Sequence, residues 1–410
     1  MKQTRRMEIA HDIWMLEVKN DASYLFEPPV SNVFIMRDNE LVLALDTGCS
    51  GVYQERFLEI LHRCVKKGAK EIIFMLSYGY WFHPQNKEIV NRAGFKKFRF
   101  LLPEPAFRNL NIINHMQKGT THVLPNDIMV FTRWIKNFVA HHDPRYQEIW
   151  KIIQAMPAGY KRKNNRAAWE SALVDTLCPG LNSYIVDSAE PIHMAHREKR
   201  SFGGEILTGW PVGRFFVIHD ASRSSGHVCI YDPLNRLMIT GDATLEMNPP
   251  FFDCDFDACI DICRKCLGMA EAGHILMATD CHRSSRWWPG FFSGQVMEPL
   301  DPVQLVDVAR GKDSCIAFYR MFVNYFSALK QETLMAHSRI GEATVPEIVE
   351  ELRKSTNKNV RFKLGLDMHN AFSNPGILVA EILDENHTSR WIDDERMIFL
   401  PFEKWNFLKE

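Results

Sequence analysis

The sequence has almost no net charge. Among 410 residues, 49 lysines and arginines face 50 aspartates and glutamates. A chain that binds nucleic acid or another polyanion through its overall field needs a clear excess of one sign. The balance therefore argues against a nucleic-acid partner, although a short basic patch over residues 161–166 leaves a polynucleotide substrate open.

Long apolar runs are also missing. No stretch approaches the roughly 20 consecutive apolar residues that a membrane-spanning helix needs. The basic start, residues 1–6, is followed by a segment that Glu8, His11, Asp12 and Glu17 interrupt. Because a signal peptide requires a continuous apolar region, we expect neither export nor a membrane partner.

The ten cysteines lack the spacing of a disulfide framework. They are scattered through apolar and helical stretches, which is typical of reduced thiols in a cytoplasmic protein. Cys259, Cys263 and Cys266 have the spacing of the radical S-adenosylmethionine cluster motif. The same three positions fall at i, i+4 and i+7 of a predicted helix over residues 257–272, so buried thiols on one helix face are the simpler interpretation.

Strand and helix patterns alternate along the first 300 residues, which is typical of an α/β fold. We expect one domain over residues 1–295 with a helical insertion at about 105–205, and an α+β carboxyl-terminal module over 296–410. The predicted strands lie at residues 13–18, 31–36, 41–48, 72–76, 98–102, 209–218, 228–231, 237–240 and 275–278, and the predicted helices include 53–67, 257–272, 314–334 and 345–353.

One aromatic loop follows the buried strand predicted at residues 72–76. It places aromatic side chains at every second position, Tyr78, Tyr80 and Phe82, and ends on His83. Alternate side chains of an extended segment point to the same side. We therefore expect this loop to line a cavity and to form part of an active site.

Four turn markers occur in an order that resembles the metallo-β-lactamase fold, a four-layer αβ/βα sandwich, over residues 10–290. The markers are a strand from Ser31-Asn32 to Asp46-Thr47-Gly48, the aromatic loop, Gly226-His227 before a hairpin, and Gly241-Asp242 with a later loop histidine. The resemblance implies a relative of hydrolases, flavodiiron proteins and diiron oxygenases.

The resemblance also implies a reduced metal centre. The family's loop reads His-x-His-x-Asp-His and binds two ions, whereas only its last histidine remains here, as His83. Arg223 stands where the family has the third histidine of the first site, and a guanidinium cannot donate a lone pair to a metal. His83, Asp242 and His282 match the second site, and two imidazoles with one carboxylate suit a single Zn, Fe or Mn ion. The alternative is that these three persist as hydrogen-bonding residues in a metal-free scaffold.

The residues around this centre predict the chemistry of the pocket. Tyr78, Tyr80 and Arg223 are candidates for shaping and charging the pocket, with Tyr78 or Arg223 stabilising an oxyanion, and His219 is a candidate acid or base. His227, which follows Gly226, is better explained as a hydrogen-bonded loop residue. The candidate substrate-binding residues form an aromatic pocket with a cationic rim and are Trp81, Phe82, Arg283, Arg286 and Trp287.

The sequence thus predicts a metal-dependent enzyme for a small anionic or aromatic substrate. With zinc we expect hydrolysis of an ester, thioester or amide, which the family's known members favour slightly. With iron, the open positions would suit an oxygenase or oxidase. The rival hypothesis is a metal-free protein that binds a small ligand, and a homo-oligomer is compatible with either.

Overall fold

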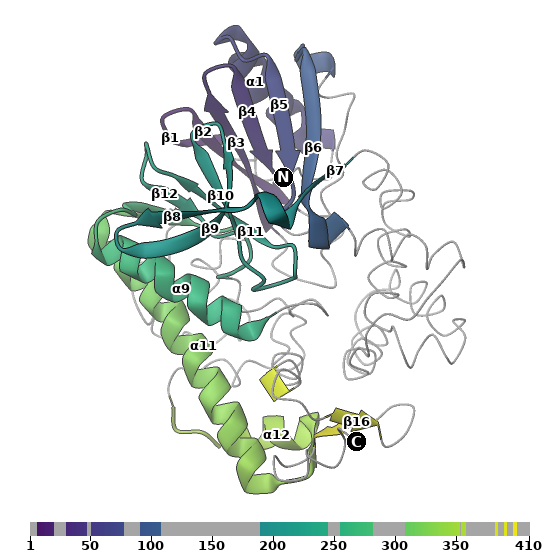
Figure 1. The fold of residues 1–410 in the computed structure, drawn as a ribbon, viewed down its shortest axis with the longest axis vertical. Coiled ribbons are helices and arrows are strands. Elements are labelled where there is room, and N and C mark those ends of the chain that lie inside the picture. The colour runs from purple at the N-terminus through teal and green to yellow at the C-terminus, as the bar shows by residue number, and fades with distance from the viewer. Residues whose placement is uncertain are drawn as a thin grey trace, which may run out of the picture.

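The computed structural model describes the chain in several stretches (Figure 1). The described residues are 6–19, 30–46, 51–77, 91–107, 189–244, 255–281, 308–352, 354–357, 382–383, 389–391 and 397–399. The aromatic loop, residues 282–307 and the middle of the predicted insertion lie outside the described residues.

Sheet A has seven strands in the described part of the chain, and their order in the sheet follows the sequence. Its first four strands form an antiparallel meander, and β4 to β7 are parallel to one another. The strands are β1 (Arg6–Ala10), β2 (Ile13–Lys19), β3 (Val30–Asp38), β4 (Leu41–Leu45), β5 (Glu71–Met75), β6 (Lys97–Pro103) and β7 (Glu190–Ile192).

Helix α1 (Gly51–Lys66) makes the crossover between the parallel strands β4 and β5 and covers the outer face of sheet A. Its apolar residues recur at helical spacing, and Phe57 packs against Phe74 of β5 with ring centroids 6.0 Å apart. Phe74 in turn contacts Phe98 of β6 at 5.5 Å. A helix in this connection is expected, because parallel neighbours need a long crossover.

Sheet B also has seven strands among the described residues and packs against the inner face of sheet A. Its order is β14-β13-β12-β11-β10-β9-β8, with only the β12–β13 pair parallel. The strands are β8 (Glu198–Phe202), β9 (Glu205–Val212), β10 (Phe215–His219), β11 (Val228–Asp232), β12 (Leu237–Ile239), β13 (Met277–Thr279) and β14 (Ala309–Arg310).

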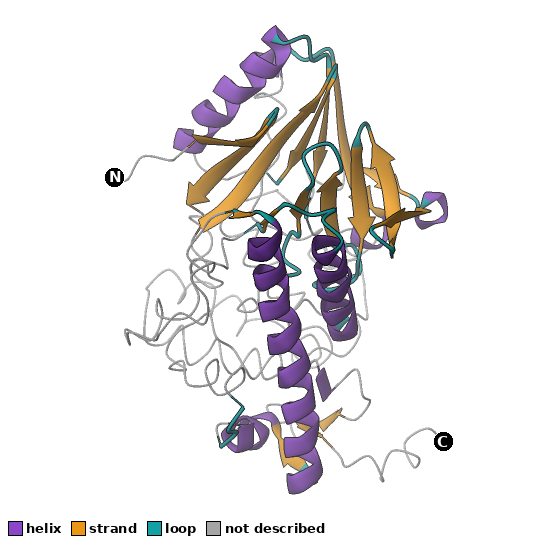
Figure 2. Ribbon diagram, turned by 90° about the vertical axis from the view of Figure 1, so that its left-hand side faces the viewer, coloured by secondary structure: helices purple, strands orange, loops and turns teal. Residues whose placement is uncertain are grey.

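Two helices cover the outer face of sheet B and run side by side (Figure 2). Helix α9 (Phe256–Glu271) begins where the Asp255 side chain accepts a hydrogen bond of 3.0 Å from Ala258 N–H. Helix α11 (Lys312–Ile340) is longer and extends beyond the sandwich to α12 (Val345–Leu352) and to the small sheet C. Sheet C consists of β15 (Ala343–Thr344), β17 (Met397–Phe399) and β16 (Ser389–Trp391).

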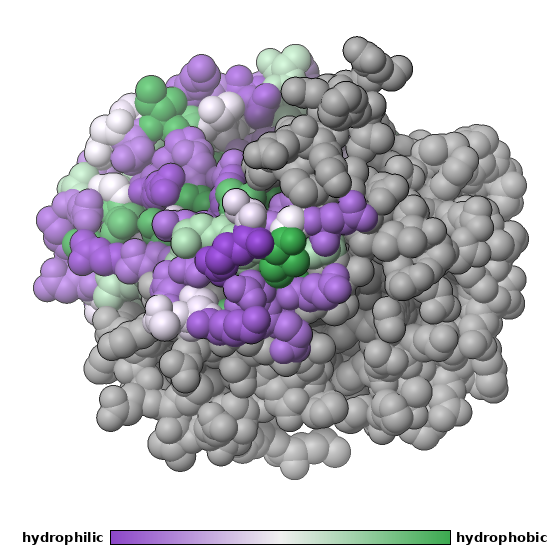
Figure 3. Space-filling model, turned by 90° about the horizontal axis from the view of Figure 1, so that it is seen from below, coloured by the Kyte–Doolittle hydropathy of each residue, from purple (hydrophilic) through white to green (hydrophobic). Residues whose placement is uncertain are grey.

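Two apolar cores hold these layers together. One lies between the sheets, where Phe34, Leu45 and Met75 of sheet A meet Val217 and Ile239 of sheet B. The other lies between sheet B and the α9–α11 pair. The layers are therefore helix, sheet, sheet, helix. Seen from below, the described residues present a mostly hydrophilic surface with single apolar side chains rather than a broad patch (Figure 3).

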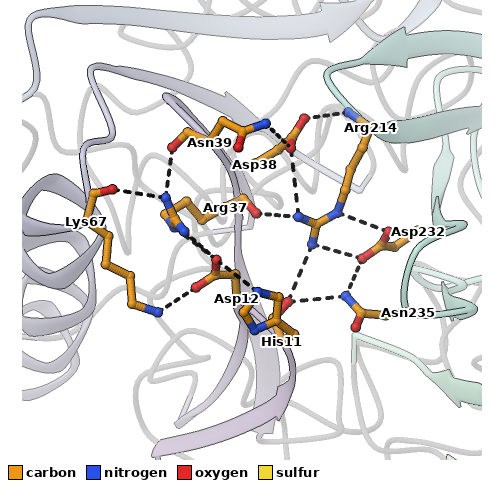
Figure 4. Close-up of polar contacts among 9 residues, drawn as sticks. All are labelled: His11, Asp12, Arg37, Asp38, Asn39, Lys67, Arg214, Asp232 and Asn235. Atoms are coloured by element: carbon orange, nitrogen blue, oxygen red, sulfur yellow. Dashed lines mark hydrogen bonds and ion pairs between the residues drawn. The ribbon is translucent and has the colours of Figure 1, made fainter.

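A polar network closes the end of the sandwich where the hairpins turn (Figure 4). Asp12, buried in the β1–β2 turn, accepts hydrogen bonds from Arg37 at 2.5 Å and Lys67 at 2.6 Å. Arg214, from the β9–β10 turn of sheet B, bonds Asp232 at 3.0 Å and the carbonyl of Arg37 at 2.8 Å. The network therefore joins turns of both sheets by charge-assisted hydrogen bonds.

Most of the predicted elements within the described residues are confirmed, but one strand is wrong. Residues 209–218 form no single strand: Gly213 adopts φ +57°, the chain turns at Gly213-Arg214, and β9 pairs antiparallel with β10. Two further stretches belong to the sheets rather than to appended parts. Strands β7 and β8 lie within the predicted insertion, and β14 with α11 extends sheet B and its helix layer.

No helix in the described stretches has both the length and the apolar character required to cross a membrane.

Candidate functional site

The polar loops of both sheets meet at the end of the sandwich opposite the hairpin turns. They follow the carboxyl ends of β4, β5, β10, β12 and β13. Most of their polar side chains are buried, which is costly unless each group finds partners. The buried members include Asp46, Ser77, Asp220, Ser222, Arg223, His227, Thr240, Asp242 and Asp280.

Asp46 ties the starts of two loops together. It is fully buried, and its positive φ of 53° turns the chain directly after β4. One carboxylate oxygen accepts the Ser77 N–H at 2.9 Å, and the other accepts the Cys281 thiol at 3.3 Å. Burial raises the pKa of Cys281 well above its usual 9.0, so this thiol keeps its proton and donates it. Ser77 and Cys281 immediately precede the aromatic loop and His282, so one carboxylate fixes where both segments begin.

Asn32 of β3 also fixes the segment at Asp280 and Cys281, which precedes His282. Its backbone N–H donates to the Cys281 carbonyl at 2.5 Å, and its side-chain amide donates to the Asp280 carbonyl at 2.9 Å. The Ser31-Asn32 marker thus has a physical role, because it anchors the segment that leads to His282.

The backbone of Asp242 is gripped from two directions. Its N–H donates to Nε2 of His227 at 2.9 Å, and its carbonyl accepts Nε of Arg223 at 2.7 Å. The residue is 1% exposed. Gly241 precedes it with φ +55°, and a Cβ there would lie 2.6 Å from Nε2 of His227. Glycine is therefore required at 241 for His227 to reach the Asp242 N–H.

The bond from Asp242 fixes the tautomer of His227. Because Nε2 accepts a hydrogen bond from the Asp242 N–H, the ring proton is on Nδ1, which donates to Oδ2 of Asp220 at 2.8 Å. Burial tends to raise the pKa of Asp220, but its interactions with His227 first, and then with Ser222 and Cys229, hold it below its usual 3.8. Asp220 therefore stays ionised and orients the imidazole.

Asp220, His227 and Cys229 also form a group that could hold a metal ion. One ligand atom from each lies within 4.8 Å of the others, and all three residues are buried. In the present arrangement they are joined by hydrogen bonds, since the Cys229 thiol donates to Asp220 at 3.1 Å. Burial raises the pKa of Cys229 well above 9.0, so a bound ion would first have to displace that proton.

Arg223 is buried rather than displayed at a surface. It is 1% exposed, and its guanidinium carbon lies 5.8 Å from the ring centroid of Phe326 in α11. Together with its bond to Asp242, this contact makes Arg223 a link between the site and the helix layer. The predicted role in oxyanion stabilisation stays a prediction.

His219, the candidate acid or base, is half-buried at the end of β10. Its Nε2 donates to the Ser225 carbonyl at 2.7 Å, and its Nδ1 accepts from Arg197 at 3.1 Å. Burial lowers its pKa. The neutral imidazole thus joins the loop between β10 and β11 to Arg197, which directly precedes β8, and proton transfer by His219 stays a prediction.

The remaining predicted site residues lie outside the described residues. They are Tyr78, Tyr80, Trp81, Phe82, His83, His282, Arg283, Arg286 and Trp287. The described part of the chain brings Ser77, Asp242 and Cys281 to one end of the sandwich, and a shared site for the segments that follow them stays a prediction.

Two roles in this region could not be predicted from the sequence. Asp220 orients His227, which lies seven residues further along the loop. Asp46 has the pattern of a turn residue, but its sequence does not indicate that it binds Ser77 and Cys281. The simpler interpretation of the cysteines, buried thiols on one helix face, is confirmed: Cys259, Cys263 and Cys266 lie on the buried face of α9 as free thiols. His227 is also confirmed as a hydrogen-bonded loop residue.

A scan against protein-family models and a search of curated proteins found no match. Solved structures do resemble the chain. The stereoselective inverting sec-alkylsulfatase from Pseudomonas sp. aligns at a TM-score of 0.52 and 10% identity, covering 95% of this chain and 51% of that one. The chain thus spans about half the length of the sulfatase.

Two further structures align at lower scores. A metallo-beta-lactamase family protein from Thermus thermophilus has a TM-score of 0.45 at 13% identity, covering 95% of this chain and 98% of its own. A beta-lactamase domain protein from Burkholderia ambifaria has a TM-score of 0.47 at 12% identity, covering 97% and 93%. The layers helix, sheet, sheet, helix agree with the sequence prediction: the chain has the metallo-β-lactamase fold.

Proposed function

We propose that the chain is a metal-dependent hydrolase of small esters, thioesters or amides that carry an anionic or aromatic group. The ligands would be His83, Asp242 and His282, holding one divalent ion, with zinc, iron and manganese as the candidates. The observation on which this proposal rests is the pair of hydrogen bonds that fix the backbone of Asp242. A buried carboxylate whose backbone is fixed on both sides, next to the anchored starts of the other two ligand segments, is the kind of support that metal ligands require.

The donor set fits such an ion. A carboxylate and two neutral imidazoles suit zinc, iron or manganese and leave open coordination positions for substrate. A bound divalent ion supplies a water of lowered pKa and polarises the substrate carbonyl.

The residues of this chain would divide the remaining tasks. Asp220 and His227 keep the Asp242 backbone in place, so that its side chain keeps one direction. Arg223 adds a positive charge next to Asp242, because its Nε–H donates to the Asp242 carbonyl. The aromatic loop would supply the wall of the pocket and exclude water, with Tyr78 and Tyr80 as hydrogen-bond donors to a developing oxyanion.

Metal analysis of the purified protein tests the proposal. We expect about one ion per chain, and Asp242→Asn and His282→Ala should each weaken metal binding beyond the about 10- to 100-fold that loss of a supporting residue causes. Asp261→Asn and His62→Ala change the same residue types at exposed positions on α9 and α1 and should bind like the wild type. A chain without stoichiometric metal, and indifferent to added Zn(II), Mn(II) or Fe(II), would contradict it and favour a metal-free binding protein.

Substrate assays with each loaded ion separate the chemistries. Aromatic esters, thioesters and amides, with a secondary alkyl sulfate added because one structural neighbour is a sec-alkylsulfatase, report on hydrolysis. Oxygen consumption by the iron-loaded protein, without hydrolysis by the zinc-loaded protein, would instead favour an iron oxygenase or oxidase.

A further inference from the structure

A cavity of about 530 Å³ opens between the two sheets, and none of its described lining residues is a candidate site residue, although Trp210 in its wall contacts His219 with ring centroids 5.8 Å apart. One wall is formed by the inner face of β5 and β6, and the other by β9 with its turn at Gly213. Small-molecule sites in proteins usually measure about 300–1,000 Å³ and are apolar with a few polar groups. The cavity falls within that range.

The deep part of the cavity is apolar and belongs to the core between the sheets. Ile73 and Leu101 of sheet A face Trp210 and Val212 of sheet B, and all four are at most 8% exposed. Trp210 is fixed in place because its Nε1–H donates to the His193 carbonyl at 3.1 Å. This part can take a hydrocarbon or aromatic body.

At the mouth of the cavity, β5 and β6 each begin with charged side chains on the same face that carries apolar side chains later in the strand. Side chains two apart on a strand share a face, so Lys97 and Arg99 lie on the same face of β6 as Leu101. Glu71 precedes Ile73 in the same way on β5. Charged groups on the inner face of a sandwich would be costly in a closed core, and here they stand where the cavity opens.

The donors at this mouth outnumber its carboxylates. Among the described residues there, Lys97, Arg99, His193 and His196 stand against three carboxylates, those of Glu71, Glu190 and Glu104, and Nδ1 of His193 lies 3.7 Å from Glu104. Lys97 contacts Glu71 at 2.9 Å, while Arg99 reaches out to Glu190 with Nε and Nη2 on a single carboxylate oxygen. These two bonds do not use Nη1, and a guanidinium has five N–H donors in all.

We propose that this cavity binds a small amphipathic carboxylate, with its apolar body against Ile73, Leu101, Trp210 and Val212 and its headgroup at Arg99 and Lys97. Arginine suits this role because its planar fork matches a carboxylate. The site is separate from the candidate metal centre and needs no metal.

Calorimetric titration of the full chain with octanoate tests the proposal, with 1-octanol as the uncharged comparison. We expect saturable one-to-one binding of octanoate and at least about tenfold weaker binding of octanol, since a hydrogen-bonded charge pair contributes that much. Arg99→Gln should weaken octanoate binding about tenfold. Arg92→Gln, which changes another half-exposed arginine paired with a glutamate, should leave it unchanged.

A second variant and a second measurement locate the ligand. Ile192→Phe places a larger side chain at the lining of the cavity and should also reduce binding. Octanoate should slow amide hydrogen exchange in β6 and β9, which does not depend on any variant folding. No saturable binding, equal binding of octanol, or binding that neither variant nor the exchange pattern assigns to this cavity would overturn the proposal.

Discussion

Replacement of Asp12 by asparagine should destabilise the fold strongly although the site lies at the other end of the sandwich. Asp12 is buried and receives Arg37 at 2.5 Å and Lys67 at 2.6 Å. It also adopts φ +59°, a region that aspartate and asparagine tolerate better than most residues. Asparagine therefore keeps the shape and the backbone conformation, removes the charge, and replaces one of the two acceptor oxygens by an amide NH2 donor.

The expected loss of unfolding free energy depends on how exposed to solvent the side chains of Arg37 and Lys67 are. The Arg37 side chain is 16% exposed, so its pair with Asp12 resembles a buried ion pair, which costs about 3–5 kcal/mol to break completely. The Lys67 side chain is 46% exposed, and its pair contributes about 0–1 kcal/mol. Because the asparagine oxygen can still accept one hydrogen bond, we expect a loss of about 2–4 kcal/mol.

The pH dependence gives a second, independent expectation. Burial tends to raise the pKa of Asp12, but the hydrogen bonds from Arg37 and Lys67 lower it below 3.8. A carboxyl group whose pKa is lower in the folded state stabilises the fold above its unfolded pKa and loses that contribution as the pH falls through the folded value. The difference between wild type and Asp12→Asn should therefore be full at pH 7 and shrink below about pH 3.8.

Urea denaturation followed by circular dichroism measures both effects, provided that the slope m is unchanged. Asp261→Asn is the matched control, because Asp261 is 60% exposed and pairs with Lys265 on the surface of α9. It should change the free energy of unfolding by less than about 0.5 kcal/mol. Equal midpoints for the two variants at pH 7, or a difference that persists unchanged in acid, would refute the reasoning.

Three further outcomes are expected. Gly241→Ala should destabilise the chain by about 1–3 kcal/mol and weaken metal binding, because the Cβ of the alanine would displace His227. Urea denaturation measures the loss of stability and metal titration measures the affinity, and an unchanged metal affinity would contradict the role assigned to His227. Asp220→Asn should lower stability at pH 7 by about 2–4 kcal/mol, as measured in the same melts, by removing the charge that orients His227, and wild-type stability would count against it. With a thiol reagent, at most three of the ten cysteines should react in the native state, since seven are buried free thiols, and all ten should react in denaturant; fast labelling of more than three would show that the core opens.

The class of fold and the positions of most strands and helices could be predicted from the amino-acid sequence. The apolar run before Ser77, the hairpin around residues 37–40 and the amphipathic helix over α1 are local patterns, and local patterns are set by side-chain periodicity. The four turn markers were enough to identify the metallo-β-lactamase fold, because each marks the end of a strand that the fold brings to one edge.

Which side chains meet at that edge depends on the packing of the whole chain. Asp46 bonds Ser77 and Cys281, which are separated from it by 31 and 235 positions, and no periodicity encodes such a contact. The turn at Gly213 and the membership of β7, β8 and β14 in the sheets likewise depend on pairing between strands rather than on the strands themselves. Pairing and burial are properties of the packed chain, and they fix where Asp242 is held and how His227 carries its proton.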